Sequence, residues 1–277
     1  MYPIISIITV CYNSENTISK TIASVLAQDL SEAEYLIIDG ASTDRTISII
    51  NEYKDLFGDK LSIVSEKDNG WYDAMNKGIS NSHGKFIVFL NSDDYFDKNI
   101  ITEVVKFAKV NNLTDDSIIY GDSTNVYRNS KGEIFHRFTQ APEALKRCKD
   151  LRDGMCGIRH QAMFTGRRVF EKVGMLNLKY RLHADWDFLV KCLDCDIKMM
   201  HIRSNVVYYS MYGASTKPNY LERHQLRKDN HLYRMVDWYY VKDRWGLKVI
   251  LKRILGENRW NDLLFRIHVM KKKTWYK

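Results

Sequence analysis

Short apolar runs alternate with helical patterns over the first third of the chain, and this alternation restricts the fold more than any other feature. The apolar runs, rich in Ile, Val, Leu and Phe, have the length of strands and lie at residues 4–10, 35–39, 61–65 and 85–90. After the first run, apolar residues recur at helical spacing, namely Ile18, Ile22, Val25 and Leu26. Strands separated by helices form βαβ units with right-handed crossovers. We therefore expect an α/β fold with a mostly parallel central sheet flanked by helices.

The overall composition fits a globular protein whose positive charge lies in one segment. The chain has 277 residues, 45% of them hydrophobic and 27% charged, which is enough to bury a core. Residues 242–277 hold eleven Lys and Arg against three Asp and Glu, so this segment alone carries the net charge of +8. The rest of the chain is electrically balanced, and we expect no nucleic-acid partner because its candidate binding residues are acidic.

Cysteine usage and hydropathy predict a cytoplasmic protein. Five cysteines are an odd number in a chain of this size, which argues against a disulfide framework. The apolar run at residues 4–10 is too short for a signal peptide, and no apolar stretch reaches the roughly 18 residues of a membrane span.

Acidic and polar side chains follow each of the expected strands. Asp39 ends the second strand, Glu66 and Asp68 follow the third, and Asp93 and Asp94 follow the fourth. Parallel sheets bind their ligands at the carboxyl ends of the strands. These residues are therefore expected to converge on one ligand-binding edge.

Four sequence blocks carry a resemblance to a known family. They read ISIITVCYNSENTI, LIIDGASTDRT, EKDNGWYDAMNKGI and FLNSDDYF in chain order, and HQAMF at 160–164 and ADWDF at 184–188 extend the pattern. In this order the blocks resemble the inverting glycosyltransferases of family 2, in particular those of bacterial polysaccharide biosynthesis of the colanic-acid type. The resemblance implies a GT-A fold, which is Rossmann-like. It also implies transfer of a sugar from a nucleotide sugar, a UDP-sugar above all, to a hydroxyl of a glycan or lipid-linked glycan.

Changes of pattern along the sequence divide the chain. Residues 1–115 would form the nucleotide-sugar half of one GT-A domain, and residues 116–215 its acceptor-binding half. In the second half the alternation becomes irregular, with strand-like runs at 198–202 and 205–210. Residues 216–277 would form a helical, basic C-terminal extension.

The LNSDDYF block at residues 90–96 suits a divalent metal, Mn²⁺ or Mg²⁺. A hard cation prefers carboxylate oxygens and keeps few protein ligands when a diphosphate supplies the others. In the family this block is an Asp-x-Asp element, but here Asn91 stands at its first position. Asp93 is therefore the expected metal ligand, and Asp94 its neighbour at the donor.

The resemblance assigns the other donor contacts. Asp39 matches the residue that contacts the pyrimidine ring, and Thr9 and Tyr12 would complete that pocket. A second nucleotide-contacting loop would include Glu66 and Asp68. The helix that follows would add two further residues, Asn76 and Lys77. Lys77 either meets phosphate or is a solvated helix residue.

Asp185 is the expected catalytic base. Direct displacement at the anomeric carbon requires a group that accepts the proton of the acceptor hydroxyl. Asp185 matches the Asp of the family's Glu-Asp-aromatic motif, with Ala184 in place of the Glu, and Asp187 is the second choice. The apolar face formed by the residues that follow predicts that Asp185 is the N-cap of a helix. His160 and His183 are candidates for donor or acceptor contacts, or are structural.

The basic C-terminal segment predicts contact with a membrane surface. Residues 245–277 combine an apolar helical face with Lys, Arg and Trp, a pattern typical of helices that bind anionic membranes. A helix packed on the domain or on another subunit is the alternative. We expect a cytoplasmic enzyme, peripheral on the inner face of the cell membrane.

Two other functions compete with this prediction. Transfer to a polyisoprenyl phosphate needs no base, because that acceptor is already ionised. A non-catalytic nucleotide-sugar-binding subunit is suggested by Asn91 and Ala184, which replace acidic residues of the family.

Overall fold

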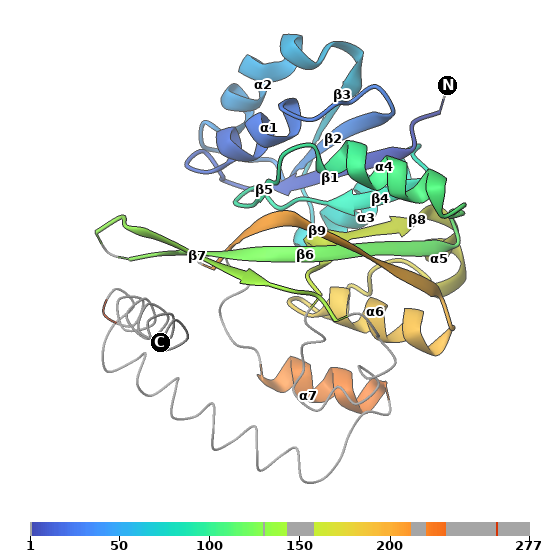
Figure 1. Ribbon diagram of the computed structural model, residues 1–277. Coiled ribbons are helices and arrows are strands. Elements are labelled where there is room, and N and C mark those ends of the chain that lie inside the picture. The colour runs from blue at the N-terminus through green and yellow to red at the C-terminus, as the bar shows by residue number, and fades with distance from the viewer. Residues whose placement is uncertain (1, 130, 143–157, 212–219, 231–258, 260–277) are drawn as a thin grey trace, which may run out of the picture. The chain divides into compact units, whose positions relative to one another are not determined.

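The computed structural model describes residues 2–129, 131–142, 158–211, 220–230 and 259 (Figure 1). These residues fall into two compact units. The first takes in the chain up to Ser123 together with the described residues of Thr139–Tyr209. The second takes in Thr124–Phe138 and the described residues from Ser210 onward, including helix α7 (Tyr220–Asp229). Most of the segment predicted to bind membrane lies outside the described residues.

The first four strands form the parallel part of the sheet, in the order β3-β2-β1-β4. Their bounds are β1 (Ile5–Cys11), β2 (Ala33–Asp39), β3 (Leu61–Ser65) and β4 (Phe86–Phe89). Every residue of β1 and β4 is buried, which is why these strands read as continuous apolar runs. The expected α/β fold is confirmed, and the predicted strand positions agree to within two residues.

The sheet continues beyond β4 with antiparallel pairs. The additional strands are β5 (Tyr95–Phe96), β6 (Ser117–Arg128), β7 (Ile134–Thr139), β8 (Met163–Gly166) and β9 (Lys198–Ser210). Strand β8 lies between β4 and β6 and is antiparallel to both, as the side-by-side strands in Figure 1 show. The sheet is therefore mixed. Its parallel strands come from the N-terminal part of the chain, and the strands beyond β4 are added by antiparallel pairing.

Helices join and cover the strands. Their bounds are α1 (Ile18–Leu26), α2 (Thr46–Phe57), α3 (Trp71–Asn81), α4 (Ile100–Val110), α5 (Arg167–Val173) and α6 (Ala184–Asp194). Short 3₁₀ turns η1 (Gly58–Lys60) and η3 (His160–Ala162) precede β3 and β8. Helix α3 packs against β1 and β2, and α5 packs against α6. None of the helices in the described part of the chain has the length and apolar character needed to cross a membrane.

The core brings the carboxyl ends of the parallel strands together. Gly78 lets α3 approach β1 closely, because a Cβ atom there would lie 2.5 Å from Cγ2 of Ile8. The strand register pairs Cys11 with Asp39 and Asp39 with Ser65. The carboxyl ends of β1, β2 and β3 therefore lie side by side, as the sequence predicts.

Candidate active site

Asp39 organises the loops at the carboxyl ends of the strands. Its side chain is buried and accepts hydrogen bonds from the Ser65 hydroxyl (2.7 Å), the Ser42 amide (2.9 Å) and the Ser42 hydroxyl. The Cys11 thiol donates to the same carboxylate at 3.6 Å. Burial, and then the charge of Asp39, raises the pKa of Cys11 well above its usual range, so this thiol stays neutral. The contact of Asp39 with a pyrimidine ring stays a prediction.

Loops after β1, β2 and β4 meet beside this carboxylate. Ser14 lies 2.9 Å from Ser92, hydroxyl to hydroxyl, and so connects the end of β1 with the LNSDDYF block. The Asn13 amide donates to the Ser42 hydroxyl at 2.8 Å. Tyr12, which precedes these residues, is 61% exposed. An exposed aromatic ring next to converging loops suits stacking on a flat ligand.

The loop between β3 and α3 brings three of the expected donor residues together. Lys77 pairs with Glu66 at 2.8 Å and also donates to the backbone carbonyl of Lys67. The hydrogen bond to Glu66 raises the pKa of Lys77. Asp68 accepts from the Gly70 amide at 2.8 Å and lies against Gly40, where a Cβ atom would be 2.5 Å from Oδ2 of Asp68. The loops that follow β2 and β3 thus lie against each other.

Two expected donor residues are engaged in packing. The Thr9 side chain is buried, and its hydroxyl accepts a hydrogen bond from the Tyr35 hydroxyl at 3.0 Å. The Asn76 side chain exchanges two hydrogen bonds with the backbone of Leu176, at 2.9 and 3.0 Å. Their donor contacts stay predictions.

The two aspartates of the LNSDDYF block have different surroundings. Asp94 is buried, and its Oδ2 accepts from Nε2 of Gln161 at 3.0 Å. The Thr21 hydroxyl donates to the backbone carbonyl of Asp94 at 2.7 Å. Asp93 is half-buried, and burial raises the pKa of its carboxyl group. A cation beside Asp93 would favour its ionised form.

The possible metal ligands at this site fit a cation that binds together with a diphosphate. The described residues contain no group of three or more His, Cys, Asp or Glu side chains that could enclose an ion. Asp93 offers one hard carboxylate ligand, which suits Mg²⁺ or Mn²⁺ when phosphate and water oxygens supply the remaining positions.

Asp185 is the second residue of helix α6, whose N-cap is His183. The expectation that Asp185 caps the helix is wrong by two positions. The first helical hydrogen bond runs from the Asp187 amide to the His183 carbonyl at 3.0 Å, so helical geometry starts with Ala184. In the first turn, Asp185 still faces the positive end of the helix dipole.

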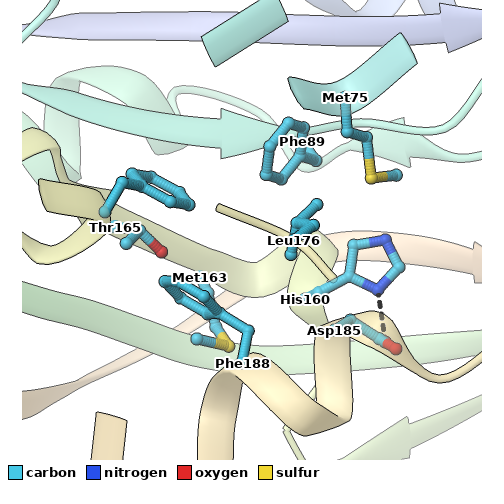
Figure 2. Close-up of a pocket in the computed structure, with 9 residues that line it drawn as sticks. Met75, Phe89, His160, Met163, Thr165, Leu176, Asp185 and Phe188 are labelled. Carbon is cyan, nitrogen blue, oxygen red and sulfur yellow. Dashed lines mark hydrogen bonds and ion pairs between the residues drawn. The ribbon is translucent and has the colours of Figure 1, made fainter. Parts of the chain in front are cut away.

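The Asp185 carboxylate is held by two donors from other parts of the chain. The Tyr72 hydroxyl donates to Oδ1 at 2.7 Å. Nδ1 of His160 lies 3.0 Å from Oδ2, the contact that is dashed in Figure 2. Burial opposes ionisation, but the hydrogen bond and charge of His160, with smaller contributions from Tyr72 and His183, lower the pKa of Asp185 to about 2. The side chain remains 30% exposed. Asp185 is thus an ionised, oriented and accessible carboxylate at neutral pH.

Asp187, the second choice for a base, has a different environment. Its side chain is buried and pairs with Lys191 at 2.6 Å, one helical turn further along α6. A carboxylate engaged in this way has less access to a substrate than Asp185.

A small cavity of about 20 Å³ adjoins Asp185. Its walls include the apolar side chains of Phe89, Met163 and Phe188, while His160 and Asp185 lie together at one end of it (Figure 2). A volume of this size admits one water-sized group. The largely apolar surroundings strengthen the electrostatic contact between His160 and Asp185.

Comparison with known proteins identifies the family of this chain. The model of the family described as "Glycosyl transferase family 2" matches residues 6–174. A PGL/p-HBAD biosynthesis glycosyltransferase of Mycobacterium bovis is 30% identical over 216 residues, which cover 76% of this chain and 78% of that protein. The putative teichuronic acid biosynthesis glycosyltransferase TuaG of Bacillus subtilis is 27% identical over 191 residues, covering 68% of this chain and 73% of TuaG.

Solved structures show the same fold. TarS 1–349 of S. aureus, in complex with UDP-GlcNAc, superposes with a TM-score of 0.64 at 17% identity, over 82% of this chain and 65% of that one. The mannosyltransferase PcManGT of Pyrobaculum calidifontis, in complex with GDP-Man and Mn²⁺, gives a TM-score of 0.61 at 14% identity, over 99% of this chain and 83% of that one. The expected GT-A fold is confirmed. Because the family model spans more than half of the chain and the family's sequence blocks meet at one site, this chain is a glycosyltransferase that belongs to glycosyl transferase family 2.

Proposed function

We propose that this glycosyltransferase is metal-dependent and inverting, and that it moves a sugar from a UDP-sugar to a hydroxyl of a glycan or lipid-linked glycan. The observation that carries the proposal is the state of Asp185, which is ionised, held by Tyr72 and His160, and still accessible. A general base must combine these three properties before it can receive a proton from an acceptor.

The relatives support the choice of substrates. TarS binds UDP-GlcNAc, and PcManGT binds GDP-Man together with Mn²⁺. The sequence relatives named above act in the biosynthesis of PGL/p-HBAD and of teichuronic acid. By analogy we assign this chain a nucleotide-sugar donor, a divalent cation and a role in cell-surface polysaccharide biosynthesis.

The residues divide the reaction between them. The loops around Asp39, Asp68 and Lys77 would hold the nucleotide and its phosphates, and Tyr12 would stack on the base. Asp93 would hold the cation, which neutralises the charge that develops on the leaving diphosphate.

Asp185 acts on the acceptor. It takes the hydroxyl proton while the acceptor oxygen bonds to the anomeric carbon and the bond from that carbon to the donor phosphate breaks. One displacement of this kind inverts the configuration of the sugar. Because the pKa of Asp185 is low, the proton moves late, when the hydroxyl oxygen has already become acidic.

A binding screen tests the donor side. UDP-, GDP- and TDP-sugars are titrated into the protein with and without Mn²⁺, and Asp93→Asn is compared with the wild type. We expect UDP-sugars to bind, Mn²⁺ to tighten binding at least about tenfold, and Asp93→Asn to remove most of that gain. Equal affinity with and without Mn²⁺ would refute the metal assignment. Tight binding without hydrolysis or transfer would favour the non-catalytic subunit instead.

A further inference from the structure

Two consecutive residues of turn η3 each hold a different part of the site. His160 contacts Asp185, and Gln161 contacts Asp94 of the LNSDDYF block. We propose that this pair is a positioning element, in which one turn fixes the spacing between the loop that holds the donor diphosphate and the base that activates the acceptor. This inference rests on the proposed function, because it gives the two contacts a catalytic purpose.

The turn itself is firmly anchored. The Ala162 amide donates to the Arg159 carbonyl at 2.9 Å, and η3 packs against β4. The chain then continues directly into β8, where Met163 pairs with Tyr120 of β6. The side chains of Gln161 and Ala162 are fully buried. The sheet therefore fixes the position of the turn.

Gln161 binds the metal loop from inside the protein. Its Nε2 donates to Oδ2 of Asp94 at 3.0 Å, and both side chains are almost completely buried. The Asp94 amide closes a turn onto the Asn91 carbonyl at 3.0 Å. Gln161 thus fixes the residue next to Asp93, the proposed metal ligand, and does so without occupying the ligand position.

His160 is the hydrogen-bond donor in its contact with Asp185. Because Asp185 is ionised, its Oδ2 only accepts, so Nδ1 of His160 carries the hydrogen of their 3.0 Å bond. This bond sets the rotation of the carboxylate together with the bond from Tyr72. The positions of His160 and Asp185 at one end of the cavity are visible in Figure 2.

Each of the two side chains also has a second polar atom that is buried. Nε2 of His160 and Oε1 of Gln161 have no hydrogen-bond partner among the residues that the structure describes. Buried polar atoms without partners destabilise a fold, and apolar side chains of similar size would avoid that penalty. Packing alone therefore does not explain these two polar residues. Their hydrogen bonds to Asp185 and Asp94 do explain them.

The catalytic value of such a turn follows from the geometry of displacement. The acceptor oxygen must approach the anomeric carbon in line with the departing phosphate, and errors of about 1 Å lower the rate by about a hundredfold. The base and the diphosphate come from segments far apart in sequence. A single rigid turn that binds both limits these errors.

The test compares two variants in the full-length protein with two measurements. His160→Leu removes the donor to Asp185, and Gln161→Met removes the donor to Asp94 while nearly preserving side-chain volume. The pKa of Asp185 is measured by carbon-13 NMR, and the affinity for UDP with Mn²⁺ is measured by calorimetry. Circular dichroism and thermal melting establish that each variant is folded.

We expect a separation of effects. His160→Leu should raise the pKa of Asp185 by about one pH unit or more and lower turnover about 10- to 100-fold, with little change in UDP affinity. His160→Asn, which retains a donor near the Nδ1 position, should restore most of both properties. Gln161→Met should weaken binding of UDP with Mn²⁺ about tenfold and leave the pKa of Asp185 unchanged.

The controls make each failure interpretable. His83→Leu changes an exposed histidine of the same unit and should alter neither measurement. The inference is overturned if folded His160→Leu and Gln161→Met variants keep wild-type values, or if both variants lose both properties only in step with stability. If Asp185→Asn retains full turnover, the proposed function fails. If Asp185→Asn is inactive but His160→Leu is normal, only the positioning role fails.

Discussion

At the residue scale, Asp39 shows how one buried carboxyl group can organise the loops at the carboxyl ends of the strands. Its carboxylate is surrounded by donors from Ser42, Ser65 and Cys11. An amide at this position would place an NH₂ group against some of those donors. We expect Asp39→Asn to lower the free energy of unfolding by about 1–3 kcal/mol, measured by urea denaturation. Ser65→Ala, which removes one donor, should cost about 1 kcal/mol; a larger loss for Ser65→Ala than for Asp39→Asn would contradict this account.

The depressed pKa of Asp185 predicts a pH-dependent contribution to stability. The pKa of an Asp in an unfolded chain is about 3.9, and in the folded protein that of Asp185 is about 2. The contribution is therefore complete above pH ~4 and is lost as the pH falls towards 2, with a maximum of about 2–3 kcal/mol. The difference in unfolding free energy between wild type and Asp185→Asn should shrink over this window. Parallel curves would show that Asp185 is not stabilised in the ionised form.

Single residues were predictable where a motif marks them and not where a distant partner defines them. The positions of Asp93 and Asp185 follow from sequence blocks that can be read locally. The hydrogen-bond partners of Asp185 and Asp94 cannot be read locally, because Tyr72 is 113 residues from Asp185 and Gln161 is 67 residues from Asp94. No periodicity connects such pairs. The HQAMF block was visible as a motif, but the direction in which each side chain points depends on turn η3 and strand β8.

At the element scale, the contact between α3 and β1 depends on the absence of a side chain. Gly78→Ala would gain up to about 1 kcal/mol in helix propensity, but its Cβ would lie 2.5 Å from Ile8. Overpacking of a core typically costs about 1–3 kcal/mol, so the steric clash should destabilise the protein more than the higher helix propensity stabilises it. We expect lower thermal stability and, because α3 carries Tyr72, weaker support of Asp185. The exposed Ser80→Ala on the same helix is the control, and a stabilised Gly78→Ala would contradict the close packing.

Elements with a strong internal period were predictable, and elements defined by pairing were not. The four parallel strands are rich in Ile, Val, Leu and Phe, so the sequence marks them directly. Strand β9 is continuous over Lys198–Ser210, although the polar residues Arg203 and Ser204 divide the sequence into two strand-like runs. Strand β5 has two residues, and β8 inserts between β4 and β6 from a distant part of the chain. Such pairings depend on tertiary contacts that hydropathy does not encode.

At the scale of the whole molecule, the charge distribution separates the catalytic domain from the C-terminal segment. Residues 242–277 carry the entire net charge, and an anionic membrane surface attracts basic amphipathic segments. We expect truncation after Asp243 to move the enzyme from the membrane fraction to the soluble fraction of a cell lysate. Unchanged partitioning would instead support a segment that packs on this chain or on another subunit. The donor-binding residues lie outside the removed segment, so UDP affinity serves as the control for folding.

The account as a whole depends on the division between donor binding and acceptor activation. Asp185→Asn retains the shape of the side chain but places an NH₂ group against one of its two donors, Tyr72 or His160, and removes the ability to take a proton. The measurement is the rate of UDP release from a bound UDP-sugar, together with the affinity for that donor in the presence of Mn²⁺. We predict that the rate falls about 10²- to 10⁴-fold while donor affinity stays within about twofold of wild type. Turnover at the wild-type rate would contradict the assignment of Asp185 as the base.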